Sequence, residues 1–128
     1  MHSARLEHAN ITVQDPKATA QELCDLFDWH IRWEGEAIGG GYTIHVGNTD
    51  SYLAVYAPPG TKRAARDSSY STLGGLNHVG IVVDDLDATE KRIASAGFTP
   101  RSHADYEPGR RFYFENYDGV EIEVISYA

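Results

Sequence analysis

The chain has 128 residues, 41% of them hydrophobic, which is enough for one compact domain or two small modules and too little for two independent domains. Its formal net charge of −8 argues against a nucleic-acid-binding surface, because such surfaces need clustered Lys and Arg. A single cysteine excludes a disulfide within the chain, and no apolar run has the length of a signal peptide or membrane span, so a cytoplasmic protein that does not enter a membrane is expected.

An internal repeat organises the chain. Residues 6–19 (LEHANITVQDPKAT) align without a gap with residues 76–89 (LNHVGIVVDDLDAT), at a constant offset of 70 and with seven identities in fourteen positions. The alignment places His8 on His78. Two related modules are therefore expected in one chain.

The first copy predicts a strand that runs into a capped helix. Asp15 is the expected N-cap, Pro16 suits the first helical position, and the helix should end near Asp28. Alternating polar and apolar residues then predict three strands. These are expected at residues 31–34, 41–46 and 52–56.

The second copy predicts the same order of elements. Asp87 and Glu90 are expected to form a capping box, and the helix should end near Ala96, where Gly97 suits a left-handed C-terminal cap. Three strands are again expected, at residues 100–103, 111–115 and 120–125.

The fold class that follows is α+β, with two βαβββ modules that form a concave mixed sheet and carry their helices on the outside. A single domain over residues 1–128 is expected. It would contain a first module at 6–57, a linker rich in Pro, Gly and Ser at 58–75, and a second module at 76–126.

Alternation along the strands identifies the side chains of the open sheet face, because apolar positions mark the packed face. In the two first strands, His8, Asn10 and His78 fall on the open side. In the last strand, Glu121 and Glu123 do so. The same rule places there His45, Tyr52, Ala54, Tyr56, Arg111 and Tyr113. Ionisable groups on an inner face are costly unless they are paired or bound to a ligand.

These residue types suggest a metal site. Neutral imidazoles and a carboxylate are common ligands of Zn, Fe, Mn, Co and Ni, and a repeat can present two imidazoles symmetrically. Aligning the last strands of the two copies puts Ala54 opposite Glu123, so only one module supplies a carboxylate. The predicted ligands of a divalent metal ion are therefore His8, His78 and Glu123.

The segments LEHANITV, LNHVGIVVDDLDA and GRRFYFENYDGVEIEV resemble the vicinal oxygen chelate superfamily, which includes glyoxalase I, bleomycin-resistance proteins, extradiol dioxygenases and fosfomycin-resistance transferases. The resemblance implies paired βαβββ modules around a divalent metal held by first and last strands. The matching positions are His8, Ala54, His78 and Glu123. Ala54 stands where members of the glyoxalase I type carry a fourth ligand, which leaves a triad of two His and one carboxylate.

The resemblance implies a metal-dependent lyase, isomerase or dioxygenase that acts on a small bidentate oxygen-containing substrate. Tyr113 is the candidate hydrogen-bond or proton donor, and Glu121 and His45 are candidate bases. Candidate substrate-binding residues are Tyr52, Tyr56, Arg111 and Asn10.

The alternative is a metal-free binding protein, similar to bleomycin-resistance proteins, that sequesters a small planar or cationic ligand. Trp29 and Trp33 are expected to be packing residues rather than a platform for such a ligand. A homodimer is expected in either case, because a cup formed by a single chain leaves exposed strand edges and hydrophobic module faces.

Overall fold

A computed structural model of the chain describes residues 3–37, 39–60, 70–106 and 109–128. The chain divides into two compact units, residues 1–63 and 64–128. Residues 61–69, which make up half of the predicted linker, lie outside the described residues. Each unit is described by itself below.

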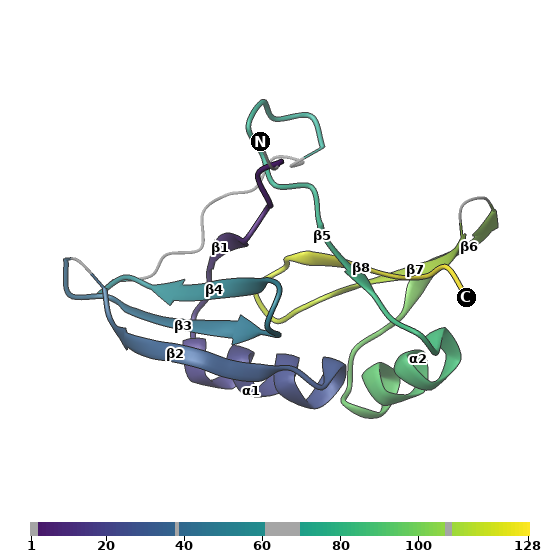
Figure 1. The fold of residues 1–128 in the computed structure, drawn as a ribbon, viewed down its shortest axis with the longest axis horizontal. Helices are drawn as coiled ribbons and strands as arrows, with labels where there is room; N and C mark the ends of the chain where they lie inside the picture. Colours follow the sequence, from purple (N-terminus) through teal and green to yellow (C-terminus); the bar gives the residue numbers. More distant parts are fainter. Residues whose placement is uncertain (1–2, 38, 61–69, 107–108) are drawn as a thin grey trace. The chain divides into compact units, whose positions relative to one another are not determined.

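The first unit contains one helix and a four-stranded mixed sheet (Figure 1). The strand order is β1-β4-β3-β2, with β1 parallel to β4 and the other pairs antiparallel. Its elements are β1 (His8–Thr12), α1 (Pro16–Phe27), β2 (His30–Glu36), β3 (Tyr42–Gly47) and β4 (Tyr52–Ala57).

The second unit repeats this topology. The strand order is β5-β8-β7-β6, with β5 parallel to β8 and the other pairs antiparallel. Its elements are β5 (Val79–Val82), α2 (Leu86–Ser95), β6 (Arg101–Tyr106), β7 (Gly109–Glu115) and β8 (Glu121–Ser126). Two βαβββ modules of an α+β fold are thus present, as the sequence predicts.

Helix α1 begins and ends where its capping residues predict. The Asp15 carboxylate accepts a hydrogen bond from the Ala18 N–H at 3.1 Å. At the other end Asp28 adopts a left-handed conformation (φ 56°), and its N–H donates to the Cys24 carbonyl. The helix packs mainly against β3 through its buried residues Thr19, Ala20, Leu23 and Leu26. None of the described helices is long and apolar enough to cross a membrane.

Helix α2 corrects one prediction. Its N-cap is Asp85, whose carboxylate accepts from the Ala88 N–H at 3.0 Å, so the predicted capping box of Asp87 and Glu90 is wrong. Leu86 is buried and is the first residue of the helix, which places the cap one residue before it. Asp85 is the repeat partner of Asp15, so both modules use the same cap.

Each unit packs one sheet face into a core and leaves the other face more open. In β3 the buried Ile44 and Val46 alternate with the half-buried Thr43 and His45. Strands β7 and β8 alternate in the same way. Their packed face carries the buried residues Phe112, Phe114, Ile122 and Val124.

The strand register confirms the predicted equivalence of the two last strands. Ala54 pairs with Asn10 on one side and with His45 on the other. Glu123 pairs with Gly80 and Tyr113 in the same way. Because the repeat places Asn10 on Gly80, Ala54 and Glu123 hold the same position, and His45 corresponds to Tyr113.

Candidate functional site

Glu123 is the centre of a hydrogen-bonded cluster on the open face of the second sheet. Its Oε2 accepts from Tyr113 Oη at 3.0 Å and from Arg111 Nη1 at 3.0 Å. Its other oxygen, Oε1, lies 3.3 Å from His78 Nε2. The Glu123 side chain is only 12% exposed. The structure therefore brings together four of the residues that the sequence proposes for a site.

Glu121 lies two residues before Glu123 on the same face of β8 and has its own donors. Its Oε2 accepts a hydrogen bond from the hydroxyl of Tyr70, and its Oε1 accepts from Arg101 Nη1 at 3.1 Å. Arg101 also contacts Glu115 at 3.2 Å. Neither Tyr70, which lies in the predicted linker, nor Arg101 is among the residues that the sequence predicts for a site. Tyr70 and Arg101 thus each donate to one of the two carboxylate oxygens of Glu121.

Tyr113 donates a hydrogen bond to Glu123 and has a raised pKa. Burial raises the pKa of Tyr113, and the hydrogen bond to Glu123 and the charge of that carboxylate raise it further. The phenol therefore stays protonated near neutral pH, where it can donate but cannot serve as a base. Its ring and the His78 ring are perpendicular to each other, with centroids 5.8 Å apart.

Arg111 links the cluster to the end of β6. Its guanidinium lies over the Tyr106 ring, 4.9 Å from the centroid, and pairs with Glu123 while only 12% of its side chain is exposed. The Nε atom is buried and has no hydrogen-bond partner among the described residues. Arg111 is thus fixed by its pairing with Glu123 and by stacking.

The open face of the first sheet carries a ring cluster instead. The Tyr52 ring is nearly parallel to the rings of His8 and His45, with centroid distances of 4.8 and 4.5 Å, and the two imidazole centroids lie 6.5 Å apart. Trp33 contacts His45 at 5.2 Å, and the Arg32 guanidinium lies 4.5 Å from the Tyr52 centroid. We call these five residues the aromatic cluster. Trp33 is 52% exposed, so its predicted role as a core residue is wrong.

Charged residues near the aromatic cluster make hydrogen bonds to it and change the pKa of His45. Glu7 Oε1 lies 2.9 Å from His8 Nδ1 and accepts a hydrogen bond from the Tyr52 hydroxyl at 3.3 Å. Burial lowers the pKa of His45, and the nearby His8 and Arg32 lower it further. A neutral His45 has a free lone pair on one ring nitrogen, which is compatible with its proposed role as a base.

The two remaining candidates lie at the side of the aromatic cluster. Asn10 is exposed on β1 and pairs with Ala54. Tyr56 is half-buried on β4, and its ring lies close over Gly41, where an added Cβ would approach Cε1 to 2.7 Å. Neither makes a ring contact with the cluster among the described residues.

The predicted metal ligands are split between the units. His8 belongs to the first unit, whereas His78 and Glu123 belong to the second and lie in contact. Over the described ranges, no group of three or more His, Cys, Asp or Glu side chains is placed to hold a metal ion.

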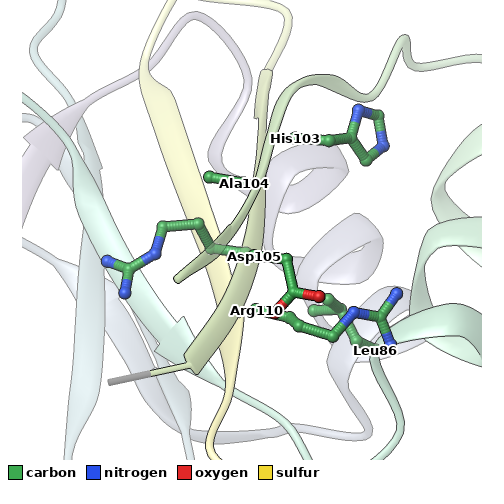
Figure 2. A pocket seen from close by; sticks show the side chains of 6 residues that line it. Leu86, His103, Ala104, Asp105 and Arg110 are labelled. Atoms are coloured by element: carbon green, nitrogen blue, oxygen red, sulfur yellow. The ribbon is translucent and has the colours of Figure 1, made fainter. Parts of the chain in front are cut away.

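A separate hollow of about 260 Å³ lies beside the start of α2 and the ends of β6 and β7. Figure 2 shows Asp105 and Arg110 on the same side of the strands as Leu86. Two of the polar side chains that line the hollow have acidic partners: Arg110 pairs with Asp87 at 3.0 Å, and His103 contacts Glu90 at 2.9 Å. Its lining residues are Leu86, His103, Ala104, Asp105, Arg110 and Arg111.

The model of the Glyoxalase/Bleomycin resistance protein/Dioxygenase superfamily matches residues 5–124. The chain belongs to this superfamily. No curated protein sequence matches it.

Several solved structures share the fold. A glyoxylase/bleomycin resistance protein/dioxygenase domain from Frankia sp. EAN1pec is 19% identical with a TM-score of 0.81, and the match covers 98% of each chain. FosX, a fosfomycin resistance protein from Listeria monocytogenes complexed with Mn(II) and sulfate ion, is 14% identical with a TM-score of 0.69, covering 98% of this chain and 93% of that one. TnmS3, an antibiotic binding protein from Streptomyces sp. CB03234, is 16% identical with a TM-score of 0.70, covering 100% and 99%.

Proposed function

We propose that the chain is a metal-dependent enzyme in which His78 and Glu123 bind a divalent metal ion. The observation that carries the proposal is the 3.3 Å separation of His78 Nε2 and Glu123 Oε1. Two donor atoms that each lie about 2.0–2.2 Å from one ion are about 3 Å apart, so this pair has the spacing of two ligands. FosX, which shares the fold, has been solved with Mn(II).

The surroundings of Glu123 favour this role over a purely structural ion pair. Arg111 and Tyr113 both donate to Oε2 and leave Oε1 on the His78 side. Ligating carboxylates commonly have such hydrogen-bonded support, which fixes their orientation. A carboxylate that is 12% exposed and held in one rotamer loses little entropy when it binds an ion.

We propose His8 as the third protein ligand on the strength of the sequence repeat alone, since His8 aligns with His78. It can come from the same chain or from a second copy in the expected homodimer. The ion would act as a Lewis acid on a small bidentate oxygen-containing substrate. Tyr113, protonated at neutral pH, would transfer its hydrogen bond from Glu123 Oε2 to a substrate oxygen when substrate binds, and Arg111 would keep the Glu123 carboxylate oriented.

Calorimetric titration with Zn²⁺ and Mn²⁺ tests the proposal. The wild-type protein should bind either ion, and Glu123→Gln should weaken binding by at least about 100-fold because the anionic ligand is lost. His103→Gln is the matched control, since His103 contacts Glu90 in the same unit and lies outside the cluster. Equal affinity in Glu123→Gln and the wild type would refute the assignment of this ligand.

A second function, metal-free binding of a small planar ligand, is favoured by the aromatic cluster of the first unit. Tyr52, His45 and a half-exposed Trp33 offer ring faces on which a planar ligand can stack. TnmS3, with the same fold, is an antibiotic binding protein. A chelator-treated protein that still binds planar aromatic compounds, with affinity lost in Trp33→Ala, would support this alternative. Loss of all binding on chelation would exclude it.

A further inference from the structure

The hydroxyl of Tyr70 connects the second carboxylate of β8 to the proposed metal ligand His78. Tyr70 donates a hydrogen bond to Glu121 Oε2, and its oxygen lies 3.4 Å from His78 Nδ1. The two rings are nearly parallel, with an interplanar angle of 29° and centroids 6.4 Å apart. Tyr70 therefore lies against the side of the imidazole that faces away from Glu123.

The direction of these hydrogen bonds follows from the chemistry of the partners. The Glu121 carboxylate is acceptor-only when ionised, so the single Tyr70 proton points toward it. The phenolic oxygen then presents a lone pair to His78 Nδ1 and can accept a hydrogen bond from this nitrogen in the Nδ1–H tautomer.

Neutral His78 carries its proton on either Nε2 or Nδ1. Glu123 Oε1 is the acceptor near Nε2, and the Tyr70 oxygen is the acceptor near Nδ1. With the proton on Nε2, the ring would donate to Glu123 Oε1 at 3.3 Å, and the nitrogen nearest the carboxylate would be closed to a metal. With the proton on Nδ1, the ring donates to Tyr70 and the Nε2 lone pair points toward Glu123. Only the second tautomer offers Nε2 and Oε1 together as ligands.

We propose that Tyr70 is a positioning residue that holds His78 in its Nδ1–H tautomer and so keeps Nε2 available as a metal ligand. The inference rests on the proposed function. It adds to the site a residue from the predicted linker between the two modules. Support of this kind, in which the second nitrogen of a ligating His donates to a fixed acceptor, commonly changes metal affinity by about 10–100-fold.

The first test uses metal-free protein and is independent of metal binding. The ¹⁵N shifts of the His78 ring are recorded at about pH 9, well above the ordinary histidine pKa of about 6.5. The wild type should show a protonated Nδ1, and Tyr70→Phe should move the proton to Nε2. Glu121→Gln retains a weaker acceptor for the Tyr70 hydroxyl and should give a smaller shift in the same direction. Tyr117→Phe, which alters an exposed tyrosine of the same unit, should give none.

The second test is a Zn²⁺ titration of the same variants. Tyr70→Phe should lower affinity about 10–100-fold, and Tyr117→Phe should leave it unchanged. A wild type that shows Nε2–H, or a tautomer that Tyr70→Phe does not alter, would overturn the proposal for Tyr70 even if Zn²⁺ binds. A protein with the Nδ1–H tautomer that refuses metal would instead refute the proposed function and leave the positioning contact standing.

Discussion

Trp33 and Arg101 hold the same position in the two sheets. Trp33 pairs with His45, and Arg101 pairs with Tyr113, the repeat partner of His45. The first unit therefore places an aromatic side chain where the second places a guanidinium that binds Glu121. One repeated strand pattern thus supports a stacking surface in one unit and a network of charges in the other.

Because Trp33 is exposed, its replacement should destabilise the protein less than replacement of a buried aromatic residue. Trp33→Ala should change the free energy of unfolding by about 1 kcal/mol or less, because the side chain is 52% exposed. Phe112→Ala should cost about 3–5 kcal/mol, because Phe112 is fully buried. Urea unfolding of both variants checks this. A loss of several kcal/mol in Trp33→Ala would mean that Trp33 belongs to a core after all.

The N-cap of α2 gives a second prediction. Asp85→Ala should destabilise the protein by about 0.5–2 kcal/mol, because the Ala88 N–H loses its acceptor. Asp87→Ala removes only an exposed pair with Arg110 and should have a smaller effect. Thermal unfolding of the two variants side by side measures the difference. A larger loss of stability in Asp87→Ala than in Asp85→Ala would indicate that Asp87 is the N-cap.

The Asp87–Arg110 pair predicts a pH effect. The hydrogen bond from Arg110 and its charge hold the pKa of Asp87 below the ordinary value of 3.8. A lowered carboxyl pKa stabilises the folded state above the ordinary value, and this contribution is lost as the pH falls through the lowered one. Arg110→Gln should return the Asp87 pKa toward 3.8, as followed by NMR of the carboxyl carbon. Lys91→Gln should give a smaller rise, since Lys91 acts through space alone. An unchanged Asp87 pKa in Arg110→Gln would contradict the pairing.

Gly47 and Gly80 differ in the space available for an added Cβ, so Gly47→Ala and Gly80→Ala should differ in stability. A Cβ at Gly47 would lie 2.3 Å from the Ser51 carbonyl oxygen and 2.6 Å from the Tyr52 Cα, so backbone must move. Gly47→Ala should therefore cost roughly 1–3 kcal/mol. A Cβ at Gly80 meets only Glu123 Oε1, at 3.7 Å, so Gly80→Ala should be tolerated. Equal stability of the two variants in urea would show that the turn after β3 can relax.

Much of the fold could be predicted from local signals. The repeat offset fixes the order of elements, and Asp15, Pro16 and Gly97 mark helix ends by their own conformational preferences. Alternation in the strands also identifies the open face. Asp87 was mistaken for a cap because three Asp residues lie close together, and burial of Leu86 decides among them.

The candidate site could be predicted only in part. The cluster of His78, Arg111, Tyr113 and Glu123 follows from strand parity, because neighbours in register on one face must meet. Tyr70 could not be found in this way, since it lies in a segment with no periodicity. Trp33 could not be assigned from its type either, because a large aromatic is common both in cores and on binding faces.

Metal content per chain tests the central claim most directly. Untagged protein should be purified without added metal beside His78→Ala, Glu123→Ala and the control His103→Ala, and each metal quantified by elemental analysis. We predict near-stoichiometric divalent metal in the wild type and the control, and its loss in the other two variants with the fold retained by circular dichroism. A folded wild type that holds no metal and takes up none of Zn²⁺, Mn²⁺, Fe²⁺, Co²⁺ or Ni²⁺ would contradict the metal site and leave ligand binding as the function to pursue.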